Sequence, residues 1–262
     1  MISCPICQSP LQIEEQEAYC SNNHHFDRAR QGYFNLHQSH RRHHGDDRLM
    51  VDARRAFLEA GFYDPLRAKM AEFIKGEEKT SLIDLGCGEG YYTHFLKKVA
   101  NLQDVVGIDI SKEALKRAAV LYPDILWLVA SIAHVPVFDG QFDWALVAFA
   151  PRYYEEIARV LKPQGYLLQV NSGPQHLMEL KEELYEVGVE NPLIETDVDH
   201  FDLVKQEIFR EKVFLKNHDL VNLLDMTPYR YKSKLERIEW VQSLPSLEIT
   251  LEFVLTLFQK SA

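Results

Sequence analysis

Three of the four cysteines lie near the N-terminus with a spacing that suits a metal ion. Cys4 and Cys7 form a C-x-x-C pair, twelve residues separate Cys7 from Cys20, and two histidines follow at positions 24 and 25. Three thiolates and one imidazole make a closed tetrahedral zinc shell. The fourth ligand is His24 or its neighbour His25, and the four-residue spacing from Cys20 favours His24. A full set of protein ligands leaves no open position, so zinc here would be structural rather than catalytic.

A glycine-rich segment with the pattern of a ligand-binding turn follows a short apolar run. It reads Asp84-Leu85-Gly86-Cys87-Gly88-Glu89-Gly90, and a helical pattern begins at Tyr91. Glycines allow a tight turn and a close approach of a ligand to the main chain. The spacing is G-x-G-x-G, which differs from the G-x-G-x-x-G fingerprint of dinucleotide-binding folds. We interpret the segment as a cofactor loop, and a glycine turn that binds nothing is the alternative.

Two further positions could contact a ligand at the ends of predicted strands. Asp109 closes the second strand about 20 residues after the glycine loop, where an acid can accept hydrogen bonds from ribose hydroxyls. Its alternative role is a helix N-cap, for which Ser111 is better placed. Phe149 and Pro151 close the fourth strand, and an aromatic ring next to a proline suits a flat base. The alternative for these two is a buried Phe and a Pro that begins a helix.

Alternating strands and helices must position these residues. Residues 50–75 have helical spacing, and from residue 81 the expected strands are 81–85, 105–110, 125–130, 142–149 and 166–170. The expected helices between them are 91–100, 112–122 and 153–161, the last stopped by Pro163, with a helix near 176–187 and a final strand near 247–258. Repeated strand–helix units of this length predict an α/β fold with a doubly wound, Rossmann-like parallel sheet. The predicted division is a zinc module at 1–36, a basic linker and helical segment at 37–75, and the main domain at 76–262.

Composition narrows the class of protein. The 262 residues are 46% hydrophobic, which supports a sizeable core and excludes wholesale disorder. No apolar run approaches the roughly 20 residues that span a bilayer. The N-terminus lacks the basic and apolar segments of a signal peptide, so we expect a cytoplasmic protein without a membrane segment or disulfides.

One stretch of the chain is basic although the whole chain carries a net charge of -10. Residues 28–55 contain seven arginines and three aspartates, which gives a local charge of +4. A basic patch on an acidic protein indicates a surface that contacts nucleic-acid phosphates. A solvated flexible linker is the alternative.

These features together resemble the RlmA family of 23S rRNA guanine-N1 methyltransferases, whose glycine loop is the first motif of class I methyltransferases. The resemblance extends over nearly the whole chain and rests on several blocks, namely Cys4-Pro5-Ile6-Cys7 with Cys20 and His24, His25-Phe26-Asp27, Gly32-Tyr33-Phe34-Asn35-Leu36, Ala53-Arg54-Arg55-Ala56-Phe57-Leu58, residues 84–93, Gly173–Lys181 and Leu224-Asp225-Met226-Thr227-Pro228.

The resemblance implies S-adenosylmethionine as cofactor, a structural zinc ion, a hairpin of 23S rRNA as partner, and a homodimer. It implies zinc on Cys4, Cys7, Cys20 and His24. The implied cofactor contacts are Tyr63, Asp84, Gly86, Cys87, Gly88, Glu89, Gly90, Thr93, His94, Asp109 and His176. Ala130-Ser131 would flank the adenine, and a turn residue is the alternative for Ser131.

The chain departs from the family at one point and leaves some alternatives open. The family often has a tyrosine where this chain has Phe149, so a base pocket using that hydroxyl would have lost it. We expect the branch that methylates guanine 745, with the guanine 748 branch of the same family as an alternative. A small-molecule methyltransferase with a structural zinc ribbon is a second alternative, and a binding module without activity is a third. The intact glycines and Asp109 argue against the last. The sequence does not identify a residue that removes the N1 proton of guanine as the catalytic base.

Overall fold

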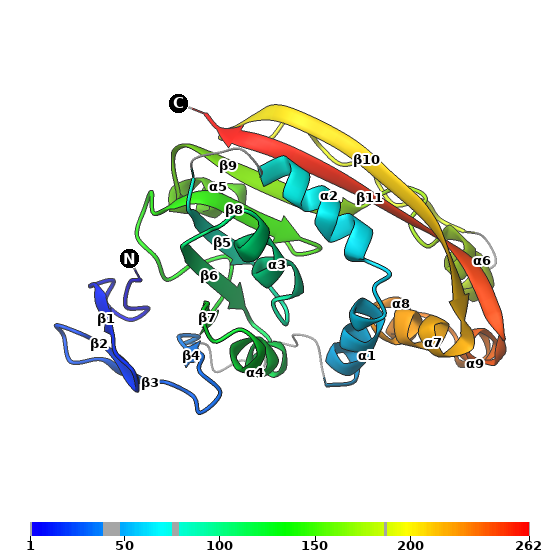
Figure 1. Ribbon diagram of the computed structural model, residues 1–262, viewed down its shortest axis with the longest axis horizontal. Coiled ribbons are helices and arrows are strands. Elements are labelled where there is room, and N and C mark those ends of the chain that lie inside the picture. Colours follow the sequence, from blue (N-terminus) through cyan, green and yellow to red (C-terminus); the bar gives the residue numbers. More distant parts are fainter. Residues whose placement is uncertain (1, 39–47, 75–78, 186–187, 262) are drawn as a thin grey trace.

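The computed structural model describes residues 2–38, 48–74, 79–185 and 188–261. A small N-terminal module lies beside one end of a larger α/β domain (Figure 1). The module contains a three-stranded antiparallel sheet in the order β1-β2-β3. Its strands are β1 (Leu11–Ile13), β2 (Glu17–Cys20) and β3 (His25–Asp27). A fourth strand, β4 (Phe34–Asn35), leaves this sheet and pairs with the large domain.

Within the described residues, eight strands form the large sheet in the order β10-β11-β9-β8-β5-β6-β7-β4. These strands besides β4 are β5 (Ser81–Leu85), β6 (Asp104–Asp109), β7 (Leu126–Val129), β8 (Phe142–Ala148), β9 (Leu161–Ser172), β10 (Phe201–Lys216) and β11 (Ser246–Lys260). The strands from β4 to β9 are parallel, whereas β11 runs antiparallel to β9 and to β10. The predicted parallel, doubly wound core is therefore confirmed, with an antiparallel hairpin added at one edge.

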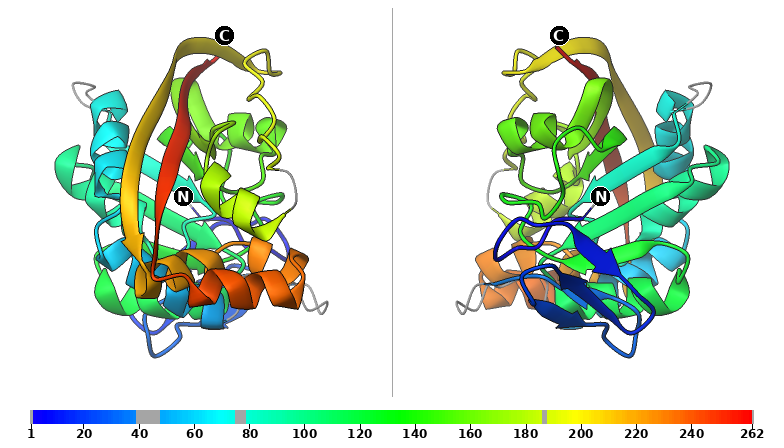
Figure 2. Two further views of the ribbon diagram at one scale, coloured as in Figure 1. Left: turned by 90° about the vertical axis from the view of Figure 1, so that its right-hand side faces the viewer. Right: turned by 90° about the vertical axis from the view of Figure 1, so that its left-hand side faces the viewer.

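Helices and the N-terminal module cover the two faces of this sheet (Figures 1 and 2). Leu82 of β5 belongs to a core shared with α2, α3 and α4, whereas the next residue, Ile83, belongs to a core shared with α5 and the module. Side chains on a strand alternate between faces, so β5 is buried on both sides. The helices are α1 (Arg48–Glu59), α2 (Asp64–Ile74), α3 (Tyr91–Val99), α4 (Lys112–Leu121), α5 (Tyr154–Val160), α6 (Met178–Leu184), α7 (Asn217–Asp225), α8 (Tyr229–Lys232) and α9 (Leu235–Ser243).

Several boundaries differ from the sequence expectations. The helical pattern at 50–75 is two helices, because the chain turns at Gly61, whose φ of 84° is in the left-handed region that glycine adopts readily. Helix α5 ends at Val160, three residues before Pro163, and β9 begins immediately at Leu161. The linker expected at 37–49 lies mostly outside the described residues. None of the helices in the described part of the chain is long and apolar enough to cross a membrane.

The N-terminal module is joined to the large domain at both of its ends. Near its start, Ile2 forms an antiparallel bridge with Val137. Near its end, Phe34 of β4 pairs in parallel with Leu128 of β7. The right-hand view of Figure 2 shows the module against the sheet from that side. The module therefore shares backbone pairing and a hydrophobic core with the large domain.

Candidate active site and metal centre

The glycine loop connects β5 to α3 and has the backbone shape that its glycines predict. Gly86, Gly88 and Gly90 all have positive φ, at 90°, 55° and 81°. A Cβ at Gly86 would stand 2.5 Å from the Cβ of Ala150, so the loop and the end of β8 are packed too closely for a side chain. A Cβ at Gly88 would meet nothing within 4 Å, so the loop faces open space there. The backbone at Gly88 is thus accessible to a ligand.

Asp109 fixes the glycine loop against the end of β6. Its Oδ2 accepts a hydrogen bond from the Gly88 backbone N at 2.8 Å, and its Oδ1 accepts one from the Ser111 backbone N at 2.8 Å. Ser111 is the N-cap of α4, because its side chain accepts from the Ala114 backbone N. The carboxylate of Asp109 also lines the pocket beside the loop. It can therefore accept hydrogen bonds from a ligand while it holds the loop.

A pocket of about 850 Å³ opens beside the glycine loop. Ligand pockets are typically about 300–1,000 Å³, so a cofactor of nucleoside size fits together with part of a substrate. Seven of the predicted cofactor residues line it, namely Tyr63, Gly86, Cys87, Gly88, Glu89, Asp109 and His176, together with Ser131. Glu89 is only 8% exposed, and its Oε2 has no hydrogen-bond partner among the described residues. A buried acceptor without a partner, beside an open glycine backbone, suits a ligand that brings hydrogen-bond donors.

The remaining predicted cofactor residues, Asp84, Gly90, Thr93 and His94, do not line this pocket. Thr93 Oγ1 donates to Asp84 Oδ2 at 2.5 Å, and both side chains are buried. A Cβ at Gly90 would stand 2.6 Å from the Trp127 ring, so this glycine is needed for packing. The ring of His94 stacks on Tyr122 with centroids 4.0 Å apart. Thr93 and His94 lie in α3, Asp84 lies in β5 and Gly90 precedes α3, and the contacts observed for all four are with other parts of the protein.

Burial changes the acidity of two carboxyl groups at the loop. Burial raises the pKa of Asp84 to about 7, although the hydrogen bond from Thr93 acts in the opposite direction and lowers this pKa. Burial also raises the pKa of Glu89 to about 7, and the positive charges of Arg55 and Arg54 oppose that rise. Burial therefore favours the protonated form of both acids relative to an exposed carboxyl group.

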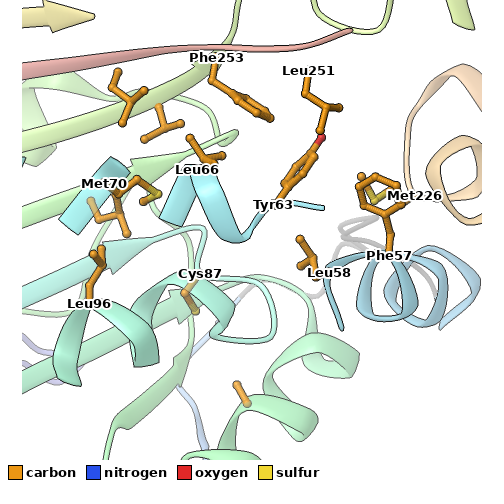
Figure 3. Packing of buried hydrophobic residues seen from close by; sticks show 14 of the residues in the cluster. Phe57, Leu58, Tyr63, Leu66, Met70, Cys87, Leu96, Met226, Leu251 and Phe253 are labelled. Carbon is orange, nitrogen blue, oxygen red and sulfur yellow. The ribbon is translucent and has the colours of Figure 1, made fainter. Parts of the chain in front are cut away.

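Aromatic side chains line the pocket where β8 ends. Phe149 is 43% exposed, and its ring lies 6.4 Å from Tyr63, 6.3 Å from Tyr92 and 5.8 Å from Phe253. Figure 3 shows Tyr63 at the start of α2 with Leu251 and Phe253 of β11 beside it. Phe149 has a φ of 57°, which is uncommon for a residue with a Cβ. Pro151 follows in the same pocket wall. This arrangement presents an aromatic ring to a ligand.

His176 lines the pocket from the segment before α6, and its protonation state follows from its contacts. Its Nδ1 accepts a hydrogen bond from the Glu252 backbone N at 3.1 Å. Burial lowers its pKa to about 3, so the ring is neutral at physiological pH. In a neutral ring whose Nδ1 accepts, the proton is on Nε2. His176 is therefore a hydrogen-bond donor through Nε2.

The structure brings together the four predicted zinc ligands. Their ligand atoms all lie within 4.8 Å of one another. His24 Nδ1 lies 3.5 Å from Cys4 Sγ and 3.4 Å from Cys20 Sγ, and Cys7 Sγ lies 3.6 Å from Cys20 Sγ. Zinc–sulfur and zinc–nitrogen bonds of about 2.3 and 2.1 Å give tetrahedral edges of about 3.5–3.8 Å, so these spacings fit a zinc ion. His25 instead contacts Glu17 at 2.8 Å, so the geometry selects His24.

Comparison with known proteins decides the family. Residues 2–43 match the family described as "RlmA, N-terminal", and residues 82–165 match a methyltransferase domain. The chain is 33% identical to a 23S rRNA (guanine(748)-N(1))-methyltransferase of Streptomyces fradiae, over 97% of this chain and 95% of that one. It is 30% identical to the protein YxjB of Bacillus subtilis, over 96% of this chain and 94% of that one. The chain belongs to the RlmA family.

As a member of this family, the protein is an S-adenosylmethionine-dependent methyltransferase with a structural zinc ribbon. Among solved structures, the YcgJ protein of Bacillus subtilis matches with a TM-score of 0.53 and 14% identity, over 75% of this chain and 98% of that one. This likeness supports the class I methyltransferase fold alone.

Several arginines of the basic stretch at 28–55 have partners within the protein where the structure describes them, and Arg30 is exposed. The guanidinium of Arg28 lies 4.5 Å above the Phe34 ring. Arg55 pairs with Glu59, and Arg48 pairs with Asp52. Arg41 and Arg42 lie outside the described residues. A phosphate-contacting surface on this stretch therefore stays a prediction.

Part of the pocket wall of this RlmA-family enzyme was not predicted from the sequence. Arg54 of α1 lines the pocket and donates to the Met226 carbonyl at 3.5 Å. Tyr92, Ser172 and the segment Met226-Thr227-Pro228 also line it. Arg54 and Met226 are 172 residues apart, so no local pattern joins them. Both residues lie in sequence blocks on which the family resemblance rests, and only this resemblance could have pointed to their place in the pocket.

Proposed function

We propose that this enzyme transfers the methyl group of S-adenosylmethionine to N1 of a guanine in a hairpin of 23S rRNA. Similarity along nearly the full chain to the Streptomyces fradiae enzyme, whose name states methylation of 23S rRNA at N1 of guanine 748, supports the proposal. The structural observation that carries it is the aromatic wall around Phe149, beside the glycine loop. A partly exposed ring at this position can stack on a flat base.

The cofactor contacts that we propose follow from the pocket wall. Asp109 accepts hydrogen bonds from the ribose hydroxyls, and Ser131 lies beside the adenine. Glu89 offers its Oε2, which has no hydrogen-bond partner among the described residues, to the ammonium group of the methionine end. The Arg54 guanidinium pairs with the carboxylate of that end. Pairing with an ammonium would favour the ionised form of Glu89. The zinc ion is held by Cys4, Cys7, Cys20 and His24 as a structural ion.

The protein contributes mainly alignment to the reaction. S-adenosylmethionine supplies a methyl group on a positively charged sulfur, which needs no further activation. Phe149 holds the base plane, and the close packing of Gly86 against Ala150 fixes that ring relative to the cofactor loop. Such positioning removes the entropy cost of a collision between two free molecules. A base within a paired hairpin has to be unstacked before it reaches this wall.

His176 has a defined role in this mechanism. Its Nδ1 is occupied by the Glu252 backbone N–H, and its pKa is far below neutral. The ring therefore does not accept the N1 proton of guanine. It donates from Nε2 to an acceptor of the bound ligand.

Basic residues also follow the pocket wall at its C-terminal side. Lys232 and Lys234 are exposed, and Lys232 ends the short helix α8 that begins directly after the pocket residue Pro228. Positive side chains beside a base pocket suit the phosphates on either side of an unstacked nucleotide. We place the enzyme in the cytoplasm with its ribosomal substrate, and we propose a homodimer as the family resemblance implies.

Replacing Phe149 tests the base-stacking wall. Single-turnover methylation of a 23S rRNA hairpin transcript should slow about 5- to 150-fold in Phe149→Ala, because stacking on an aromatic side chain contributes about 1–3 kcal/mol per base. Phe149→Tyr, which keeps the ring, should stay close to the wild-type rate. The affinity for S-adenosylhomocysteine should be unchanged in both variants. An equal rate in Phe149→Ala would remove the stacking role, and methylation of a small molecule instead of RNA would favour the alternative function.

A further inference from the structure

The loop that forms one wall of the cofactor pocket is held from outside the methyltransferase domain. This loop connects β7 to β8, and its residues Ser131, Ile132, Ala133 and His134 line the pocket. Two residues after His134, the Pro136 carbonyl accepts a hydrogen bond from the Ser3 backbone N at 2.9 Å. Ile2 forms its bridge with the next residue, Val137. The first residues of the zinc module thus contact the loop at Pro136 and Val137, which follow its last pocket residue, His134, by two and three positions.

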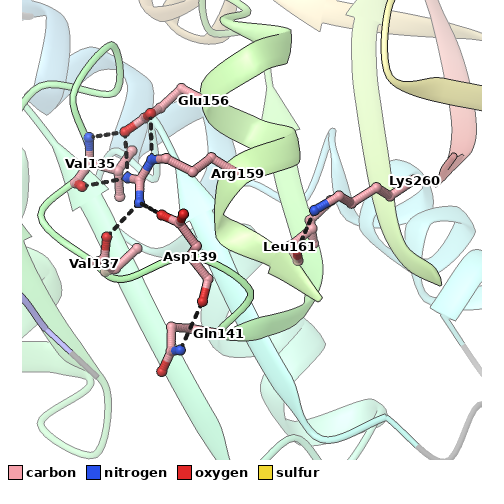
Figure 4. A network of polar contacts seen from close by, with 8 residues as sticks. All are labelled: Val135, Val137, Asp139, Gln141, Glu156, Arg159, Leu161 and Lys260. Carbon is pink, nitrogen blue, oxygen red and sulfur yellow. Dashed lines mark hydrogen bonds and ion pairs between the residues drawn. The ribbon is translucent and has the colours of Figure 1, made fainter. Parts of the chain in front are cut away.

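The same loop is held on its other side by helix α5. Arg159 donates to the Val135 carbonyl at 2.9 Å and to the Val137 carbonyl at 2.7 Å (Figure 4). Glu156 accepts from the Val135 backbone N and pairs with Arg159. Three consecutive carbonyls are therefore fixed, the outer two by Arg159 and the middle one by the zinc module. Neither support alone holds the complete segment.

The zinc module and the loop also share one hydrophobic core. The buried side chains of Ile2, Val135 and Val137 belong to the same cluster as the zinc ligands Cys4 and Cys20. At the other end of the module, the Leu36 backbone N donates to the Val129 carbonyl at 2.9 Å, at the last residue of β7 before the loop. The module therefore holds the segment from Val129 to Val137 at both of its ends.

The position of Ile2 and Ser3 depends on the metal-binding fold. The three strands of the module contain only three, four and three residues. Modules of this size lack the core to fold without a metal or a similar crosslink. Cys4 follows Ser3 directly, so a ligand of the ion stands next to the residue that holds the Pro136 carbonyl.

We propose that the zinc module is a positioning element of the cofactor site. The metal-organised segment at Ile2 and Ser3 fixes the loop at residues 135–137, and this fixes the pocket wall at residues 131–134. The module would then raise the affinity for the cofactor in the absence of RNA, in addition to any contact with a substrate. The inference rests on the methyltransferase fold and does not depend on the identity of the substrate.

The test is calorimetric titration of the full-length protein with S-adenosylhomocysteine, together with zinc analysis. Ile2→Ala shortens a buried side chain of the cluster that contains Val135 and Val137 and leaves all four ligands in place, whereas Ile2→Val is the conservative variant. If the wall is correctly placed in about a tenth of Ile2→Ala molecules, the Kd rises roughly tenfold. Ile2→Val should bind nearly as the wild type does. Ile13→Ala, at a partly exposed site on β1, is the matched control and should leave Kd unchanged.

A variant on the loop side separates positioning from loss of folding. Val137→Ala lies outside the metal module, so it should retain a full equivalent of zinc and show a similar rise in Kd. A folding defect would lower the binding stoichiometry, whereas a displaced wall raises Kd at a stoichiometry of one. Unchanged affinity in Ile2→Ala and Val137→Ala, with zinc bound and the fold intact, would overturn the proposal. An equal loss in Ile13→Ala would also overturn it, because the effect would then be general to the module.

Discussion

Replacing Asp84 by Asn should stabilise the ligand-free enzyme at pH 8 and change it little near pH 4. Asp84 is buried behind the glycine loop, and burial raises its pKa from 3.8 to about 7. An acid with a raised pKa binds its proton more tightly in the folded chain than in the unfolded chain. The free energy of unfolding therefore falls as the pH rises between these two pKa values. Asn removes the ionisation and still offers an oxygen to the Thr93 hydroxyl.

The size of the effect follows from the shift of about three pKa units. One unit corresponds to about 1.4 kcal/mol, so ionisation of Asp84 costs on the order of 4 kcal/mol above pH 7. At pH 5 only about a third of this cost is present, because the pH is little more than one unit above the unfolded pKa. The advantage of Asp84→Asn over the wild type should thus grow by about 2–3 kcal/mol between pH 5 and pH 8.

Urea unfolding of both proteins at several pH values measures this difference. All other titrating groups, including Glu89 and the zinc ligands, are common to the two proteins, so they cancel in the comparison at each pH. Asp202→Asn changes an exposed acid on β10 and should show no pH-dependent advantage. A difference between wild type and Asp84→Asn that stays constant from pH 5 to pH 8 would refute the reasoning, because Asp84 would then be ionised without cost.

Two further predictions concern the cofactor and the metal. Asp109→Ala should raise the Kd for S-adenosylhomocysteine roughly 10- to 150-fold, because one hydrogen bond to a charged group contributes about 1.5–3 kcal/mol. The same change should lower the melting temperature, because the Gly88 and Ser111 backbone N–H groups lose their acceptor. Unchanged affinity by calorimetry would limit Asp109 to supporting the loop. Elemental analysis should find one zinc per chain in the wild type and a clear loss of zinc in Cys20→Ser. Less than about half an equivalent of zinc in wild-type protein isolated without chelators would contradict the closed four-ligand shell.

Sequence patterns predicted the parallel part of the sheet well because its strands are buried on both faces. Strand β5 is buried at all five positions and is mostly apolar, and the glycine loop follows it directly. Strand β10 was not predicted. Its side chains alternate between exposed and half-buried, and it pairs only with β11 at the edge of the sheet. Such a strand carries charged and apolar residues together, so it gives no buried apolar run.

The candidate site was predictable where one local motif contained both the ligand-binding residues and their geometry. The zinc ligands and the glycine loop are of this kind. The direction of His94 was not predictable, because it depends on where α3 begins and on the Tyr122 ring against which it stacks. The contact of Ser3 with Pro136 was not predictable either, because it joins two segments through backbone atoms, which are the same for every residue type.

The most direct test of the proposed function is methylation of 23S rRNA. Unmodified 23S rRNA is incubated with the purified enzyme and S-adenosylmethionine carrying a labelled methyl group, and the modified nucleotide is then mapped. We predict one methyl group on N1 of a guanine within a single hairpin, at position 745 by our sequence prediction or at 748 as in the Streptomyces fradiae relative. Label on another base or another atom, or no label on RNA while the zinc and cofactor sites are filled, would contradict the account.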